Sequence, residues 1–249
     1  MKGLTLESRP ARQSLLSQVA TALGRLLFDP VFYGTKVARG DGRLVLVIPG
    51  LFGGDLYLEP LRSWLRRVGY TPVRSNLTLN VGCPLRLRTQ AQAQIARWQQ
   101  RKAGPLALIG HSRGGVIAWS IAAQMAEQVS HLAVLGSPLV DYRQLAASGQ
   151  VAPPRTQMAR LLRQAGDFAR RMSDPDCNFP ICECSLVRDM TRPLSPATAF
   201  LSIVSRDDEV VPPEAGEITA EQTVEVGGGH GALVYNPEVY RALGRFLAA

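Results

Sequence analysis

A single serine stands in a glycine-rich turn near the middle of the sequence. Residues 107–119 read ALIGHSRGGVIAW, so an apolar run is followed by Gly110, Ser112 and Gly114 and then by an apolar pattern with helical spacing. Glycine leaves room where a strand turns at once into a helix, and it tolerates strained backbone conformations. The spacing Gly-x-Ser-x-Gly in this context predicts a serine hydroxyl exposed above the strand, as a nucleophile requires. The alternative is a turn in which the serine only caps the helix.

A serine hydroxyl needs a neighbouring base to act as a nucleophile near neutral pH. The sequence offers His111, His131 and His230. His111 adjoins the serine, and adjacent side chains on a sharp turn point apart, whereas His131 begins a predicted strand at the opposite edge of the sheet. His230 lies in VEVGGGHGAL, just past the last predicted strand, where glycines on both sides let the loop bend back over the sheet. We therefore predict that His230 is the base.

The base in turn needs a carboxylate that orients its ring. Asp207 and Asp208 lie just beyond a predicted buried strand in FLSIVSRDDEVVPPE, between the serine and the histidine in the chain. One of the two is expected to serve the turn itself. Asp141, which follows the preceding strand in LAVLGSPLVD, is a third candidate for the acid.

Acyl transfer also requires N–H donors aimed at the oxygen of a tetrahedral intermediate. One donor is expected from the main chain of Arg113, the residue after the serine. The other is expected from Leu51, in the loop VIPGLFGGDLY after the first core strand, where glycines allow close approach of the backbone. The alternative is a plain glycine-rich turn into a helix.

Strand and helix patterns alternate along most of the chain, and this alternation must position these residues. The predicted strands cover residues 43–48, 71–77, 105–109, 131–135, 200–204 and 223–226, and the predicted helices cover 55–68, 88–101, 114–128 and 236–247. Asp55 is the expected N-cap of the first of these helices. The alternation predicts an α/β protein with a mainly parallel sheet and helices on both faces. Ligand sites of such sheets gather at the carboxyl ends of the strands.

Two segments lie outside this alternation. Residues 1–40 are expected to form an amphipathic helix and arm that pack on a domain made of residues 41–249. An interruption at about 140–196 contains a helix-like stretch, ARLLRQAGDFARRM, and a cysteine-rich loop, DPDCNFPICEC.

Four motifs together resemble the α/β-hydrolase superfamily, and within it the bacterial lipase and esterase branch. They are PGLFGG, GHSRGG, DDEVVP and GGGHGAL, in this order from about residue 44 to the C-terminus. The resemblance implies an α/β-hydrolase fold with a cap inserted at about 140–196. It matches Asp208 to the family acid through the pattern D-x-V-V-P. The first loop of that branch usually reads His-Gly-x-x-Gly; here Pro49 stands in place of the histidine, while Gly50 and Leu51 fit.

The resemblance further implies a serine hydrolase that cleaves carboxylic esters through an acyl-enzyme, with Ser112, His230 and Asp208 as a catalytic triad. A thioesterase or an acyltransferase would use the same residues, and a non-catalytic binding protein could share the fold. The presence of all three residues favours an enzyme. The expected partner is a small ester or a lipid substrate, and no cofactor and no metal is expected. Free thiols are expected at the four cysteines, with a disulfide or a zinc site as alternatives: Cys83, Cys177, Cys182 and Cys184.

The net charge of the chain does not by itself identify a class of binding partner. The formal net charge is +8, with 28 basic residues of which Lys2, Lys36 and Lys102 are the lysines. The arginines are scattered over predicted helix faces rather than gathered into an aromatic-lined stripe, so nucleic-acid binding is not expected. Weak attraction to an anionic lipid interface stays open. The sequence shows no run of 18 apolar residues and no signal-peptide pattern, so an intracellular location is expected, and it does not indicate an oligomeric state.

Overall fold

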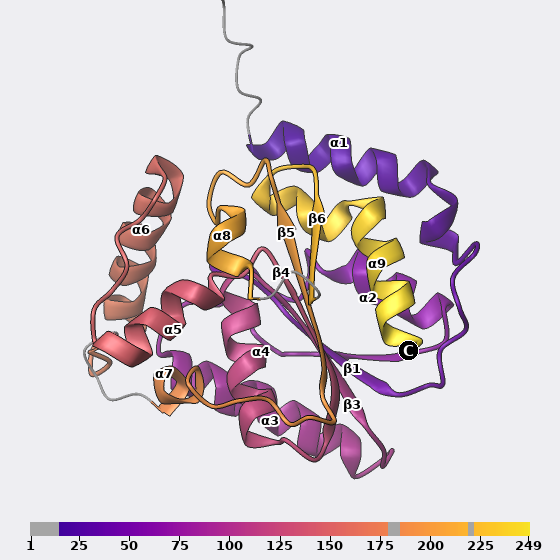
Figure 1. The fold of residues 1–249 in the computed structure, drawn as a ribbon, viewed down its shortest axis with the longest axis horizontal. Helices are drawn as coiled ribbons and strands as arrows, with labels where there is room; N and C mark the ends of the chain where they lie inside the picture. The colour runs from indigo at the N-terminus through magenta and orange to yellow at the C-terminus, as the bar shows by residue number, and fades with distance from the viewer. Residues whose placement is uncertain (1–14, 179–184, 219–221) are drawn as a thin grey trace, which may run out of the picture.

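The computed structural model describes residues 15–178, 185–218 and 222–249, and these residues form a six-stranded sheet (Figure 1). Neighbouring strands pair in parallel in the order β2-β1-β3-β4-β5-β6. The strands are β1 (Leu44–Ile48), β2 (Thr71–Arg74), β3 (Leu106–His111), β4 (Val129–Leu135), β5 (Ala199–Ser205) and β6 (Thr223–Val226). The predicted α/β class with a parallel sheet is confirmed.

Helices cover both faces of the sheet, which explains why its strands are apolar at successive positions. In β1, Val45 and Val47 join one core cluster, while Leu44 and Leu46 join the other. The first face is covered by α1 (Leu15–Phe28), η1 (Pro30–Tyr33), α2 (Glu59–Arg67), η3 (His230–Tyr235) and α9 (Pro237–Leu247). The second face is covered by α3 (Pro84–Gln99), α4 (Arg113–Gln124) and α7 (Ser185–Asp189).

The start of α2 differs from the prediction that Asp55 caps it. The helix begins at Glu59, and its N-cap residue Leu58 makes no side-chain cap hydrogen bond. The carboxylate of Asp55 instead accepts hydrogen bonds from the main-chain N–H groups of Ser75 (3.1 Å) and Asn76 (2.9 Å). The prediction was wrong because a carboxylate binds whichever N–H groups the tertiary fold brings to it. Here those groups belong to the turn after β2, which ends that strand at Arg74.

The N-terminal helix α1 packs against η3, the segment that carries His230. Leu26 of α1 is fully buried in the core, while Leu16 and Phe28 are exposed. The first 14 residues of the chain lie outside the described part. No helix in the described residues is long and apolar enough to cross a membrane.

The predicted interruption contains α5 (Leu139–Ser148), α6 (Gln157–Ser173) and α7. In Figure 1, α6 stands to one side of the sheet, beyond α5. Thr156 joins α6 to the core: its hydroxyl accepts a hydrogen bond from the N–H of Ala159 (3.0 Å) and donates one to the carbonyl of Glu209 (2.7 Å). At the other end, buried Asp189 of α7 accepts a hydrogen bond from Arg88 (2.7 Å). The segment is therefore attached to the core on both sides of α6.

Candidate active site

Ser112 occupies a strained turn between β3 and α4. Its backbone angles are φ 54° and ψ −125°, a region that non-glycine residues rarely adopt. A Cβ atom at Gly110 would lie 2.5 Å from the carbonyl oxygen of Gly114, and one at Gly114 would lie 2.5 Å from that of Pro49. Only glycine fits at both positions, because backbone atoms cannot move aside as a flexible side chain can. This close packing raises Ser112 at the carboxyl end of β3.

The structure brings Ser112, His230 and Asp208 into one hydrogen-bonded chain. The serine hydroxyl donates to Nε2 of His230 (2.9 Å), and Nδ1 of His230 donates to Oδ2 of Asp208 (2.7 Å). The ring tautomer follows from these partners. All three residues are at least nine-tenths buried. They follow β3, β6 and β5 respectively, so the parallel sheet places them together at its carboxyl edge.

The two other candidate acids have different partners. Asp207 accepts a hydrogen bond from the N–H of Gly228 (2.9 Å), so it serves the turn, as expected for one of the pair. Asp141 lies in the first turn of α5 and forms an ion pair with Arg155 (3.0 Å). Among the described residues, the carboxylate that contacts the ring of His230 is therefore that of Asp208.

The remaining oxygen of Asp208 is also used. Its Oδ1 accepts hydrogen bonds from the main-chain N–H groups of Val210 (2.8 Å) and Val211 (2.7 Å). The next residue, Glu209, accepts a hydrogen bond from the main-chain N–H of His230 (3.2 Å). The loop after β5 therefore holds both the carboxylate and the histidine that it faces.

Leu51 and Arg113 flank the serine as predicted donors of main-chain hydrogen bonds. Both residues and Ser112 line one cavity. Within the described part of the chain, no oxygen accepts a hydrogen bond from the main-chain N–H of Leu51 or of Arg113. Two N–H groups close to the hydroxyl are thus available to a ligand oxygen.

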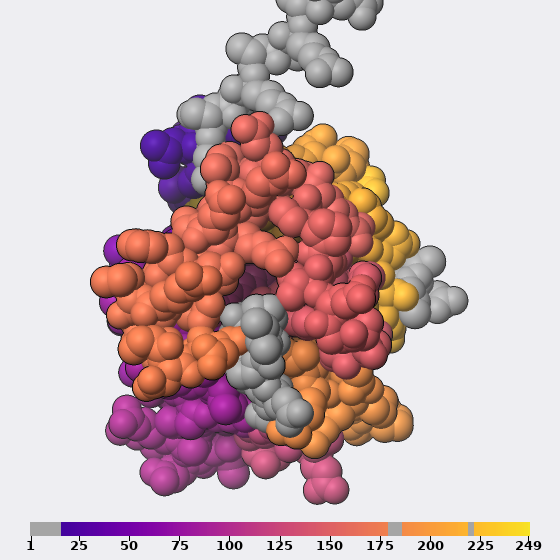
Figure 2. All heavy atoms as spheres, turned by 90° about the vertical axis from the view of Figure 1, so that its left-hand side faces the viewer, coloured from indigo at the N-terminus to yellow at the C-terminus, as the bar shows by residue number. Residues whose placement is uncertain are grey.

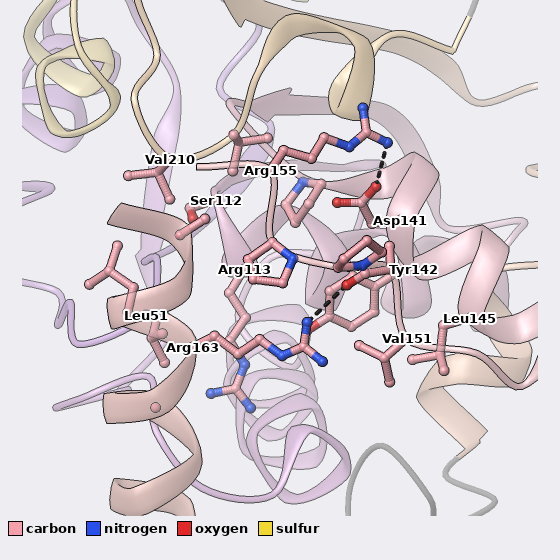
Figure 3. Close-up of a pocket in the computed structure, with 18 of the residues that line it drawn as sticks. Leu51, Ser112, Arg113, Asp141, Tyr142, Leu145, Val151, Arg155, Arg163 and Val210 are labelled. Atoms are coloured by element: carbon pink, nitrogen blue, oxygen red, sulfur yellow. Dashed lines mark hydrogen bonds and ion pairs between the residues drawn. The ribbon is translucent and has the colours of Figure 1, made fainter. Parts of the chain in front are cut away.

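The cavity has a volume of about 250 Å³ and lies under the interrupting segment. Figure 2 faces this segment and shows a hollow between α5 and α6. Figure 3 shows Ser112 at the cavity wall, with Leu51 and Val210 beside it. Most of the lining residues are apolar, and they come from the loop after β1, the loop after β5, and the segment containing α5 and α6: Leu51, Pro138, Leu145, Val151, Ala152, Pro153, Pro154, Ala159, Leu162, Gly166, Val210, Val211 and Pro212.

Comparisons with known proteins bear on the fold that carries this site. Residues 89–179 match the family model of the thioesterase domain. Among solved structures, the putative non-heme bromoperoxidase BpoC of Mycobacterium tuberculosis is 21% identical with a TM-score of 0.52, and covers 84% of this chain and 93% of its own. The protein has the α/β-hydrolase fold. The fold expected from the resemblance of the four motifs is confirmed.

Two further structures with the α/β-hydrolase fold are similar to the chain. One belongs to the metagenome-derived lipolytic enzymes LipS and LipT; it is 20% identical with a TM-score of 0.52, covering 85% of this chain and 94% of its own. Est1E of Butyrivibrio proteoclasticus is 16% identical with a TM-score of 0.53, and the match covers 83% of this chain and 87% of Est1E. No curated protein sequence matches the chain. At these identities the likeness establishes the fold.

The structure contains a second hydrogen-bonded chain that the sequence reasoning missed. The N–H of Gly50 donates to the hydroxyl of Tyr57 (2.8 Å), and that hydroxyl donates to Nδ1 of His111 (2.8 Å). Nε2 of His111 then donates to the main-chain carbonyl of His230 (3.1 Å). The loop before Leu51 is thereby linked to the loop of the histidine base. The position of His111 beside Ser112 was the only sequence signal for this role.

Burial keeps this second chain uncharged. Burial, together with a smaller effect of the neighbouring His230, lowers the pKa of His111 to about 3. Burial also raises the pKa of Tyr57. His131, by contrast, lies at the opposite end of the sheet, where its ring contacts Arg43. Its predicted separation from the serine is confirmed.

Two of the four cysteines lie in the described part of the chain. Cys83 is a free thiol, and Cys177 is buried near the end of α6. Cys182 and Cys184 lie outside the described residues. In the described part of the chain, no group of three or more His, Cys, Asp or Glu side chains is arranged to hold a metal ion.

Proposed function

We propose that this protein is a serine hydrolase that cleaves carboxylic esters through an acyl-enzyme. The observation that carries the proposal is the continuous contact from Ser112 through His230 to Asp208, with hydrogen bonds of 2.9 and 2.7 Å. Two unengaged N–H groups beside the hydroxyl support it further. Nucleophile, base, orienting carboxylate and oxyanion donors are the parts that acyl transfer requires.

In the first half of the reaction, the hydroxyl oxygen of Ser112 attacks the ester carbonyl and its proton passes to Nε2 of His230. The carboxylate of Asp208 stabilises the imidazolium that forms. The N–H groups of Leu51 and Arg113 donate to the oxyanion of the tetrahedral intermediate. The carbon–oxygen bond to the leaving alcohol then breaks, the alcohol takes the proton from His230, and the acyl group stays on Ser112.

In the second half, water attacks the acyl-enzyme. His230 accepts a proton from the water and returns it to the oxygen of Ser112 when the carbonyl–serine bond breaks. The carboxylic acid leaves, and Ser112 regains its proton. The mostly apolar cavity favours this sequence because it limits competing solvent around the charges that develop.

Thioester hydrolysis is the second candidate function. The match of residues 89–179 to the thioesterase domain model favours it, since this stretch includes Ser112, the following helix and all of α6. A thioester would react at the same hydroxyl, with a thiolate as leaving group in place of an alkoxide. Matched oxygen esters and thioesters of the same acyl group distinguish the two activities by their kcat/KM values.

A covalent label tests the proposal directly. A fluorophosphonate should phosphonylate Ser112, and Ser112→Ala should abolish labelling and lower the turnover of p-nitrophenyl esters by about 10⁴-fold or more while the protein stays folded. The matched control is Ser148→Ala in α5, an exposed serine that should keep full labelling. Undiminished labelling of the Ser112→Ala protein would reject the assignment.

A further inference from the structure

The cavity has a cationic region as well as apolar walls. Its charged lining residues are Arg113, Arg155, Arg163, Arg170, Asp141 and Asp167. Arg155 is neutralised by its ion pair with Asp141 at 3.0 Å, and Figure 3 shows this pair on one side of the cavity. Three arginines and one aspartate remain, which leaves an excess of positive charge.

The partners of these three arginines are mostly main-chain carbonyls. Arg113 donates to the carbonyls of Asn80 and Gly82, each at 2.8 Å. Arg163 donates to the carbonyl of Ala152 at 2.8 Å. Among the described residues, neither of these arginines has a carboxylate within 4.0 Å.

Arg170 is the most deeply buried of the three. Its side chain is 8% exposed and contacts the carbonyl of Cys177, and its nearest carboxylate, that of Asp167, is 3.7 Å away and 44% exposed. Its Nε has no hydrogen-bond partner within the described residues. One solvent-screened carboxylate therefore faces three guanidinium groups.

Two of these guanidinium groups lie close enough for one to act on the other. Burial lowers the pKa of Arg113, and the charge of Arg170 adds a smaller lowering. In Figure 3 the side chains of Arg113 and Arg163 extend away from Ser112, and that of Arg163 points toward Tyr142. Arg170 is buried and Arg113 is partly buried, whereas Arg163 is exposed. Buried charges without close counter-ions are costly, so an anion beside Arg113 and Arg170 would stabilise the site.

Building on the proposed ester hydrolase, we propose that its substrate carries a carboxylate or phosphate group that binds to Arg113, Arg163 and Arg170 while the ester carbonyl lies at Ser112. Guanidinium groups bind both anions through paired hydrogen bonds. Most of the other lining residues, such as Leu162 and Val211, are apolar, which fits a hydrocarbon linker between the ester and the anion. A wholly neutral acyl chain would instead leave Arg113 and Arg163 without a carboxylate within 4.0 Å among the described residues.

Matched ester pairs test this inference and locate the anion. In one arm, mono-p-nitrophenyl esters of dicarboxylic acids are compared with p-nitrophenyl alkanoates of equal length. In the other arm, acetates of hydroxy acids and of hydroxyalkyl phosphates are compared with acetates of plain alcohols. We expect the anionic member to have a kcat/KM about tenfold higher or more in one arm, since it gains charge-assisted hydrogen bonds that the neutral member lacks.

A pair of variants in one helix provides the control. Arg163→Gln should lower the ratio of the anionic to the neutral kcat/KM about tenfold. Arg171→Gln removes the same charge from an exposed position of α6 that does not line the cavity, and it should keep the ratio. Using a ratio removes any effect of either variant on the amount of folded protein. Equal ratios in Arg163→Gln and the parent protein would overturn the inference.

A binding measurement separates this inference from the proposed function. Calorimetry on the Ser112→Ala protein should detect adipate or inorganic phosphate, with weaker binding when Arg163→Gln is added, and no binding of the corresponding neutral diol. If esters are cleaved but neither anion binds and neutral esters react equally well, the inference fails and the hydrolase stands. If an anion binds in an Arg163-dependent way but no ester or thioester is cleaved, the proposed function fails and the anion site stands.

Discussion

At the scale of single residues, Asp208 has a separate task for each carboxylate oxygen. Oδ2 accepts from His230, and Oδ1 accepts from two main-chain N–H groups. Asp208→Asn keeps the shape but presents an amide to the ring, which favours the wrong tautomer of His230. We expect kcat to fall about 10³–10⁴-fold with little change in KM. Steady-state kinetics on p-nitrophenyl esters measure the loss.

The neighbouring carboxylates are the controls for this prediction. Asp207→Asn removes a turn contact to Gly228, and Asp141→Asn weakens an ion pair with Arg155. Neither side chain touches the ring of His230, so each variant should lose far less turnover than Asp208→Asn. A larger loss in Asp141→Asn would move the acid to the segment after β4.

Tyr57 offers a second test at this scale, as a positioning residue. Tyr57→Phe leaves the buried N–H of Gly50 and Nδ1 of His111 without their partner, which costs about 1–3 kcal/mol of stability. Because Gly50 precedes the proposed donor Leu51, we expect kcat to fall about tenfold while KM changes little. Tyr33→Phe, which removes an exposed hydroxyl bonded to a main-chain carbonyl, should leave kcat unchanged. Equal kcat values for the two variants would contradict the role assigned to Tyr57.

At the scale of elements, Thr156 determines how firmly α6 is attached. Its hydroxyl caps the helix and also bonds to Glu209, the neighbour of Asp208. Thr156→Ala should destabilise the start of α6 by about 1 kcal/mol, which corresponds to roughly fivefold faster hydrogen exchange of its amides. Thr156→Ser keeps the hydroxyl and should exchange like the parent protein. Identical exchange in the two variants would show that the cap contributes nothing.

At the scale of the whole molecule, His111 makes stability depend on pH. Its pKa is about 3 in the folded protein, against about 6.5 when unfolded. Between these values the unfolded chain binds more protons, so the free energy of unfolding falls as the pH falls. We expect a loss of about 1 kcal/mol from about pH 6 to about pH 5, measured by urea denaturation.

His111→Gln provides the comparison for this pH dependence. Glutamine can still donate to the carbonyl of His230 but does not titrate. The pKa of His131 is also lowered, by burial and by Arg43, but this contribution is common to both proteins and cancels in the difference. The variant should therefore show a flatter pH dependence over the same window. An unchanged slope would mean that His111 does not titrate with folding.

The sequence by itself determined the features that depend on neighbouring residues. Apolar runs marked the buried strands, and their alternation with helices marked a parallel sheet. The glycines around Ser112 marked the turn, because a strand that turns at once into a helix crowds its own backbone: a Cβ atom at Gly110 would meet Gly114 and Gly115. The place of His230 after the last strand was also readable, since all parallel strands end at the same edge.

The tertiary structure decided the contacts between residues far apart in the chain. The acid is an example: Asp141 and Asp208 both follow strands, and only the packing of the loops shows that Asp208 reaches the histidine. Asp55 binds the turn after β2 and does not cap its expected helix. Sequence patterns cannot place that turn beside Asp55. The cationic end of the cavity likewise joins arginines from α4 and α6, because the fold brings both helices to the wall of one cavity. Local patterns specify elements, whereas side-chain partners depend on how those elements pack.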